Sequence, residues 1–579
     1  MNIKNSISIL LLTILISACA TVVRPTGGPK DITPPVVLSS NPKDGSKNMH
    51  KSEIVIKFDE YVILKQLSKQ MVVSPQMPEK PIVSISGKKL TIKLPDSLRE
   101  NTTYTIFFGD AVVNFKENLP VHNFSYVFST GNIVDSLELQ GVAVNSFDHS
   151  TLEDLFVMLY KSSDDSVIYK NTPYYLTKAE SNGNFYLNNL APGKYQVYAL
   201  KDNNRNYIYD QITEEVAFYD SLVVPYHPSE YNNIDSTIKL KNTDIPAPIN
   251  LFTFTEEPKE TKFITKKIYP PNKVLFTFNR AVEDFRIEAL DFTPKSDWHF
   301  DVYGLNKDSI TCYLLGINKD TIKIALFDGN TALDTLELVL IKKKRKNNSR
   351  GTGLFGRKSK KEKQDTIIKK VIPKISYTHN ASGSFPFFSD IELKFRVPIS
   401  AYDFSKIELY KKRDTLWVPI KVKAFLSDTI SKQRVKLKAV FEERKSYKLL
   451  IRDSCFFDLY NATNDTLKTL FTTTEIREYG SLMVNIKYKD EHPLIVQLLN
   501  SKDVIIREDI IYSNKLITYP YLADGKYKIK GIIDRNLNGK WDSGDLIKKI
   551  QPEQILYINN IIDIRANWDN EQLWEIESN

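Results

Sequence analysis

Oxygen-bearing side chains recur at alternate positions in the segment that begins at Asp534. The candidate oxygen donors, at positions 1, 3, 5, 7, 9 and 12 of this segment, are Asp534, Asn536, Asn538, Lys540 through its carbonyl, Asp542 and Asp545. Gly539 at position 6 permits the tight turn that lets such groups converge on one hard cation. The spacing indicates a calcium-binding loop. A turn capped by its own Asp and Asn side chains, without an ion, is the alternative.

A related segment begins at Asp202. Asn204 and Asn206 keep the alternation, but Tyr207 stands at the glycine position and Thr213 at position 12. Because the glycine and a position-12 carboxylate are both missing, we expect a turn without a metal ion here.

Other patterns that could indicate catalysis lack the context their chemistry needs. Residues 351–356 match GxGxxG, but Lys and Arg flank them, whereas a dinucleotide loop follows a strand and opens a helix. The seven histidines form no HExxH or HxH pattern, and there is no GxSxG. Carboxylate pairs from distant strands stay open as an alternative, and we predict that the protein is not an enzyme.

The N-terminal residues have the pattern of an export signal. A basic start precedes a mostly apolar run from Ile7 to Ile16, and small residues lead to Cys19. The run is too short to span a bilayer as a helix, and the order of residues is typical of a secretory signal. Residues 16–19 resemble the lipobox of bacterial lipoproteins, which implies a signal peptide over 1–18, lipidation of Cys19 and a tether over 19–31.

The lipid anchor predicts attachment to a bacterial outer membrane. In lipoproteins of the Bacteroidota type, acidic residues directly after the cysteine mark export to the cell surface. Residues 20–24 contain no acid. The periplasmic and cell-surface faces therefore both stay open.

The basic charge is concentrated in one segment. Eleven Lys or Arg and one acid lie between Lys342 and Lys363, against a formal net charge of +9 for the chain, so the remainder is nearly neutral. Such a composition cannot bury enough apolar area to offset the entropy of ordering, and residues 342–370 are expected to form a disordered loop. Its leading basic residues are Lys342, Lys343, Lys344, Arg345 and Lys346. Lipid headgroups, acidic polysaccharide or an acidic protein surface are the expected partners, if any, rather than nucleic acid.

Cys312 and Cys455 stand in separate regions without a CxxC pattern. Two buried free thiols are expected, and one disulfide between domains is the alternative.

An internal repeat relates residues 54–130 to residues 391–473. The segments Ile54–Phe58 and Ile391–Phe395 both alternate apolar and polar residues, as a strand with one buried face does. Tyr104 corresponds to Tyr447, and each is expected to be a core aromatic whose hydroxyl bonds the backbone at a sandwich corner.

Further features of this repeat are Pro34-Pro35, Ser40-Asn41-Pro42-x-Asp44-Gly45 and Phe128-Ser129-Thr130. Together with the repeat, they resemble the SbsA-like bacterial Ig-like domain. The resemblance implies such domains over 32–131 and 371–475, and a looser match over 247–341.

A sharper repeat relates Ala191–Asp202 to Ala523–Asp534 at a constant offset of 332 residues. Upstream, the glycine, aromatic and Pro-Gly spacing of residues 183–195 resembles the transthyretin-like, carboxypeptidase-regulatory-like sandwich. The resemblance implies two such domains, over 132–246 and 476–579.

The sequence thus predicts an all-β chain, a string of Ig-like and transthyretin-like β-sandwich domains after a lipoprotein signal peptide. Chains of this kind present loops and sheet edges to proteins. We expect a non-catalytic lipoprotein that serves as scaffold or binding component of an envelope assembly, with an outer-membrane β-barrel or other envelope proteins as partners.

The alternative is a carbohydrate-binding or adhesive surface lipoprotein, since aromatic side chains on sandwich loops can stack on sugars. The tryptophans are Trp298, Trp417, Trp541, Trp568 and Trp574, and most are expected to pack in cores or joints. Recurrent Asp-Ser and Asp-Thr pairs resemble the O-glycosylation sequon of exported Bacteroidota proteins, and turn formation explains them without a sugar.

Overall fold

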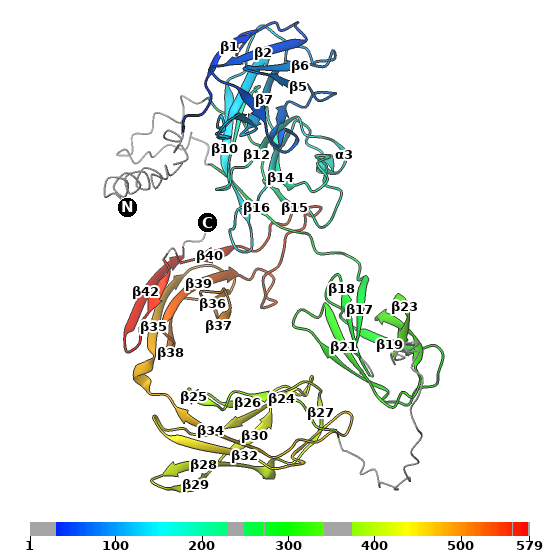
Figure 1. Cartoon of the computed structure of the whole chain (residues 1–579), viewed down its shortest axis with the longest axis vertical. Helices are drawn as coiled ribbons and strands as arrows, with labels where there is room; N and C mark the ends of the chain where they lie inside the picture. The colour runs from blue at the N-terminus through cyan, green and yellow to red at the C-terminus, as the bar shows by residue number, and fades with distance from the viewer. Residues whose placement is uncertain (1–30, 228–247, 270–271, 341–372, 559, 577–579) are drawn as a thin grey trace, which may run out of the picture. The chain divides into compact units, whose positions relative to one another are not determined.

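The computed structural model describes residues 31–227, 248–269, 272–340, 373–558 and 560–576. Within these residues nearly every regular element is a β-strand, and the helices, α2 (Leu67–Gln70), α3 (Val167–Lys170), η1 (Phe404–Lys406) and η2 (Ile476–Glu478), are single turns (Figure 1). The all-β prediction is confirmed. The described helices are all too short to cross a membrane. Cys19 and the segment 342–370, with Lys342 to Lys346, lie outside the described residues.

The chain divides into two compact units, of which the first contains residues up to Thr255 together with Gly544–Pro552. Its first sandwich has the sheets β1-β2-β6-β5, β4-β7-β9 and β3-β8. The strands are β1 (Val37–Asn41), β2 (Glu53–Phe58), β3 (Val62–Leu64), β4 (Val72–Ser74), β5 (Ile82–Ser86), β6 (Lys89–Lys93), β7 (Thr103–Gly109), β8 (Val112–Asn114) and β9 (Phe124–Ser129). The alternating residues Ile54, Ile56 and Phe58 are buried, as the period-two pattern predicts.

The second sandwich of this unit has the sheets β13-β10-β16 and β12-β11-β14-β15. The strands are β10 (Leu137–Asn145), β11 (Phe156–Tyr160), β12 (Tyr175–Lys178), β13 (Asn184–Leu190), β14 (Gln196–Lys201), β15 (Glu215–Phe218) and β16 (Ile249–Thr253). Strand β16 pairs in parallel with β10. The expected boundary at 246/247 therefore lies too early, because the apolar residues at 249, 251 and 254 complete the second core rather than open the third.

The segment Gly544–Pro552 packs on the second sandwich although it is distant in sequence. Leu546 is 2% exposed and lies in one apolar cluster with Phe156 and Tyr198. Lys549 Nζ donates to Tyr198 Oη at 2.7 Å, and Gln551 Nε2 donates to the Phe218 carbonyl at 3.0 Å. No sequence pattern predicted this contact.

The second unit contains three sandwiches. The third sandwich of the chain has the sheets β17-β18-β21-β20 and β19-β22-β23. Its strands are β17 (Phe263–Tyr269), β18 (Lys273–Phe278), β19 (Phe285–Ala289), β20 (His299–Tyr303), β21 (Ser309–Leu314), β22 (Thr321–Asp328) and β23 (Thr331–Val339). Its core contains Phe276, Trp298, Cys312 and Leu326.

The fourth sandwich has the sheets β24-β26-β31-β30, β25-β34-β32-β28-β29 and β27-β33. Its strands are β24 (Tyr377–His379), β25 (Gly383–Phe385), β26 (Ile391–Phe395), β27 (Ile399–Tyr402), β28 (Ile407–Arg413), β29 (Leu416–Ile420), β30 (Lys423–Leu426), β31 (Arg434–Lys438), β32 (Ser446–Ile451), β33 (Phe456–Asp458) and β34 (Leu467–Thr473). Tyr447 Oη accepts a hydrogen bond from Glu442 N at 2.8 Å, and Tyr104 Oη accepts one from Arg99 N at 2.9 Å in the first sandwich. Both tyrosines are buried, which confirms the predicted corner role.

The fifth sandwich has the sheets β38-β35-β42 and β37-β36-β39-β40, with β41 also paired to β39. Its strands are β35 (Gly480–Tyr488), β36 (Leu494–Asn500), β37 (Ile505–Ile511), β38 (Lys515–Leu522), β39 (Gly525–Ile533), β40 (Ile555–Tyr557), β41 (Ile562–Ile564) and β42 (Asp569–Ile576). Its strand order repeats that of the second sandwich, including a parallel pair, β35 with β42 in place of β10 with β16. The third and fourth sandwiches likewise repeat the four-stranded sheet order of the first.

Cys312 and Cys455 are buried free thiols in the third and fourth sandwiches. The expectation of free thiols is confirmed.

Candidate cation-binding loops

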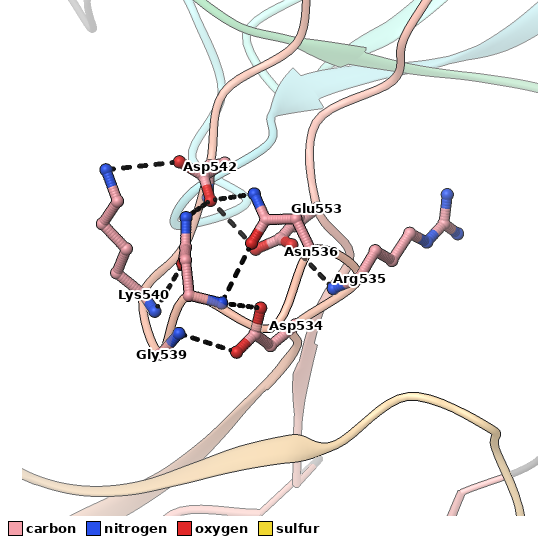
Figure 2. A network of polar contacts seen from close by, with 8 residues as sticks. Asp534, Arg535, Asn536, Gly539, Lys540, Asp542 and Glu553 are labelled. Atoms are coloured by element: carbon pink, nitrogen blue, oxygen red, sulfur yellow. Dashed lines mark hydrogen bonds and ion pairs between the residues drawn. The ribbon is translucent and has the colours of Figure 1, made fainter.

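The loop after β39 is organised around the carboxylate of Asp534, which is 2% exposed. Its Oδ1 accepts a hydrogen bond from Asn538 N at 3.1 Å, and its Oδ2 accepts one from Gly539 N at 2.8 Å (Figure 2). Gly539 has φ 76°, in the left-handed region that glycine adopts without strain. The residues at positions 1 and 6 are thus joined by a hydrogen bond, an arrangement that fits both a calcium loop and a self-capped turn.

Asp542 is the point on which the other donors of this loop converge. The carboxamide nitrogens of Asn536 and Asn538 both donate to Asp542 Oδ2, the first at 2.7 Å, and Lys540 Nζ lies 3.4 Å from Asp542 Oδ1 (Figure 2). Positive and donor groups thus surround one carboxylate. If each carboxamide were rotated by about 180°, its oxygen would lie where its nitrogen now lies. The loop would then offer several oxygen ligands to a hard cation.

Glu553, rather than Asp545, completes the loop. The Glu553 carboxylate is 6% exposed and accepts hydrogen bonds from Arg535 N at 2.7 Å and Asp542 N at 3.1 Å. Asp545 accepts from Lys548 N at 2.9 Å and forms an ion pair with the Lys548 side chain at 3.1 Å. Glu553 therefore takes the place of Asp545 in the candidate ligand set. The residues 544–552 leave the loop, and the chain comes back to it at Glu553.

The loop that begins at Asp202 has the same construction. Asp202 is 4% exposed, and its two carboxylate oxygens accept from Arg205 N and Tyr207 N, each at 2.6 Å. The carboxamide nitrogens of Asn204 and Asn206 donate to Asp210 at 3.1 and 2.6 Å.

Tyr207 adopts φ 60°, close to the 76° of Gly539 at the same position. The missing glycine therefore does not change the loop conformation, although a non-glycine residue in this region carries strain.

Glu214 holds in this loop the place that Glu553 holds in the other. It is fully buried, and its Oε1 accepts a hydrogen bond from Asn203 N at 3.0 Å. Its Oε2 is buried and has no hydrogen-bond partner among the described residues. Burial raises the pKa of Glu214, and the nearby carboxylates of Asp202 and Asp210 raise it further.

Burial likewise raises the pKa of Glu553, with added contributions from Asp542 and Asp534. Each loop therefore gathers three carboxylates, two of them buried, which favours either a bound proton or a bound cation. Oxygen ligands of this kind suit Ca²⁺. Sequence reasoning missed both glutamates because Glu214 follows Asp210 by four residues and Glu553 follows Asp542 by eleven.

Arg205 connects the first loop to its surroundings. Its guanidinium donates to the Ser68 carbonyl at 2.8 Å and pairs with Asp154 at 3.1 Å. Asp154 also pairs with Lys178 at 2.6 Å and lines a polar hollow of about 550 Å³ within the first unit. A cation that stiffens the loop would therefore also stiffen the wall of this hollow.

Comparison with known proteins identifies part of the chain. Residues 31–130 match the family model described as bacterial Ig-like domain. No curated protein matches the chain. The class of protein that the fold defines is thus a multidomain β-sandwich chain that begins, in its described part, with a bacterial Ig-like domain.

Two solved structures to which the chain shows a distant likeness are an S-layer protein and a pilin subunit. The S-layer protein rSbsC is 10% identical, with 91% of this chain and 67% of that chain covered and a TM-score of 0.14. The major pilin subunit BcpA of Bacillus cereus is 10% identical, with 76% and 99% covered and a TM-score of 0.13. At these TM-scores the likeness supports no conclusion about this chain.

Proposed function

We propose that the protein is a non-catalytic lipoprotein of the bacterial envelope, a scaffold or binding component of a protein assembly. The observation that carries the proposal is the repetition of sandwich topology, with one four-stranded sheet order in three sandwiches and one parallel-paired order in two. Repeated sandwiches offer many loops and sheet edges for protein contacts.

The chemistry of the described nucleophiles supports a non-catalytic role. Burial raises the pKa of Cys455 to about 12 and holds the pKa of Cys312 well above its ordinary value. A nucleophilic cysteine needs the opposite shift, toward the thiolate. Both thiols therefore serve packing better than they would serve catalysis.

Membrane attachment is the second part of the proposal. Cys19 would carry the acyl chains that hold the protein at the outer membrane, and several chains on one residue give stable anchoring. The basic residues Lys342 to Lys346 add a site for anionic headgroups or an acidic protein surface. An outer-membrane β-barrel or another envelope protein is the proposed partner.

Calcium is the proposed cofactor of both loops. The buried, unpartnered Glu214 Oε2 supports this for the loop at Asp202, because an isolated buried carboxylate oxygen is costly unless a proton or cation compensates it. The loop at Asp534 has the same architecture and a glycine at the turn. In each of the two transthyretin-like sandwiches, bound calcium would stiffen the loop and the end of the strand that precedes it, β14 or β39.

Carbohydrate binding is the second candidate, and one residue favours it. Trp568 is 61% exposed, with the Arg565 guanidinium 5.7 Å from its ring centroid, whereas Trp298 and Trp574 are buried in cores. An exposed indole can stack on a sugar ring, so the candidate carbohydrate-binding site is the surface around Trp568.

The test is co-purification of the full lipidated chain from membranes under mild detergent. A stoichiometric envelope protein that copurifies supports the scaffold role. Glycan-array binding that Trp568→Ala abolishes would favour the second candidate instead. Recovery of the chain alone, with neither partner nor glycan, would contradict both.

A further inference from the structure

Three metal-ligand side chains lie together on two paired strands of the third sandwich. His299 and Asp301 alternate along β20 and so share one face, and Asp301 is the direct partner of Cys312 on β21. The candidate ligand atoms of the three residues all lie within 4.8 Å of one another. Cys312 belongs to the apolar core, so the group points toward the sandwich interior.

The polar members of this group lack the hydrogen bonds that their burial demands. His299 Nδ1 and Asp301 Oδ1 are buried and have no hydrogen-bond partner in the described part of the chain. Nδ1 does lie 2.9 Å from Asp301 Oδ2, but as a close approach without hydrogen-bond alignment. Polar atoms left in this state beside an apolar core are destabilising.

A metal ion would compensate all three groups at once. Imidazole nitrogen, carboxylate oxygen and thiolate sulfur together suit zinc and similar borderline ions, and do not suit calcium. A divalent ion bound to one carboxylate and one thiolate also leaves no net charge, which keeps the cost of burial low. This donor set differs from the all-oxygen loops described above.

The alternative chemistry for a cysteine beside a histidine and an aspartate is nucleophilic catalysis. The Cys312 side chain is fully buried. No substrate could reach it without unfolding of the core. A metal ion is small enough to enter past the side chains of His299 and Asp301, which are 24% and 16% exposed.

We propose that His299, Asp301 and Cys312 form a binding site for a zinc-type transition metal ion. His299 Nδ1, one Asp301 oxygen and the Cys312 sulfur are the ligands. The thiol proton is released to solvent as the metal–sulfur bond forms. The fourth tetrahedral position is left for water or an outside ligand. The ion connects His299 and Asp301 on the edge strand β20 to Cys312 on β21 and so stabilises this edge of the sheet.

The experiment uses the full chain, freed of metal by a chelator and titrated with Co²⁺ as a spectroscopic stand-in for Zn²⁺. We expect one thiolate-to-cobalt charge-transfer band together with the visible bands of a tetrahedral ion. Excess Zn²⁺ should displace both. Cobalt uptake without a thiolate band would overturn the proposal, because it would indicate oxygen ligands only.

Matched variants separate this site from the rest of the chain. Cys312→Ser should abolish the thiolate band, whereas Cys455→Ser, at the other buried free thiol, should keep it. His299→Gln and Asp301→Asn should weaken cobalt binding on the order of tenfold or more. A band that survives Cys312→Ser, or that Cys455→Ser removes, would contradict the assignment.

A second readout guards against a variant that fails to fold. In the unsubstituted chain, Zn²⁺ should slow labelling of Cys312 by a thiol reagent while labelling of Cys455 stays unchanged. Equal rates at Cys312 with and without Zn²⁺ would overturn the proposal without recourse to any variant.

Discussion

At the scale of single residues, the buried carboxylate of Glu214 requires compensation of its charge. Its carboxylate is fully buried beside those of Asp202 and Asp210, and one of its oxygens has no partner among the residues that the structure describes. Asp202 is buried as well, whereas Asp210 is exposed, and a buried carboxylate beside two others resists ionisation unless its charge is compensated. A proton at low pH or a cation at neutral pH would each relieve the repulsion.

The raised pKa of Glu214 predicts a pH dependence of stability in the absence of calcium. Its folded pKa lies above the ordinary value of 4.5, so protonation favours the folded state. This contribution is fully present below pH 4.5 and is lost as pH rises through the folded pKa. Glu214→Gln should therefore unfold at a higher temperature than the parent at neutral pH, with the difference vanishing in acid.

The measurement is calorimetry of the full chain with chelator present, as a function of pH. Glu153→Gln, an exposed carboxylate of the same unit, is the control and should behave as the parent does. A lower melting temperature for Glu214→Gln at neutral pH would mean that the charged carboxylate is stabilising, and the prediction would be wrong.

Calcium should raise the stability of both the second and the fifth sandwich. At free calcium one hundred times the dissociation constant, linkage adds about 2.7 kcal/mol to the free energy of unfolding of a domain with one site. Asp534→Ala with Asp542→Ala should remove this gain for the fifth sandwich, and Asp202→Ala with Asp210→Ala for the second.

Each double variant is the control for the other, since the loops lie in different sandwiches. Calorimetric transitions of the parent that do not move between chelator and physiological calcium would leave only self-capped turns. The Asp and Asn positions at 534–542 were predictable because alternation and glycine are local. The glutamates were not, because their distance along the chain differs between the two copies.

At the scale of elements, period-two alternation predicted the core strands well. Strands such as β2 and β26 bury every second residue, as half-buried strands do. The parallel partner β16 was assigned to the wrong domain, because an edge strand reached through a long connection has no local signal for its partner. The looser third repeat still forms the sheet order of the first sandwich.

The insertion 544–552 is the element that sequence reasoning missed altogether. The repeat at offset 332 ends near Asp542, and the additional residues before Glu553 have no counterpart in the first copy. Their main-chain bridge between Asp545 and Ile550 presents Leu546 to the apolar cluster that contains Phe156. The tertiary packing of one leucine therefore determines where this loop lies.

Leu546→Ala should release the insertion from the second sandwich. Truncation of a buried leucine costs about 2–5 kcal/mol, which exceeds what the polar contacts of Lys549 and Gln551 are expected to contribute. Hydrogen exchange of the full chain should show faster exchange at the Asp545 and Ile550 amides and along β15. Ile547→Ala, at a residue that is 60% exposed, should leave these rates unchanged. Equal exchange rates in both variants would show that Leu546 does not hold the insertion.

At the scale of the whole molecule, two kinds of sandwich are each used more than once, and the described residues account for five folded domains with separate apolar cores. The first and second sandwiches also share an apolar cluster, which contains Val72 and Phe156. The core residues of all these clusters follow position 48, so a change at position 19 removes none of them.

Replacement of Cys19 by serine should therefore convert a membrane-bound protein into a free one without unfolding it. In the proposed lipoprotein an acylated Cys19 would hold the chain on the bilayer through several buried acyl chains, and serine cannot carry them by the same chemistry. The measurement is fractionation of cells that produce the parent or Cys19→Ser, followed by calorimetry of the released protein. Sedimentation with membranes should be lost, and the unfolding transitions should coincide with those of the parent extracted in detergent. Cys455→Ser, which removes a buried thiol far from the anchor in sequence, should stay in the membrane fraction. If Cys19→Ser still sediments with membranes after a high-salt wash, the acyl anchor does not explain the attachment. High salt screens the attraction of the basic residues at 342–346 for anionic lipid. A protein partner would then be what holds the chain at the membrane.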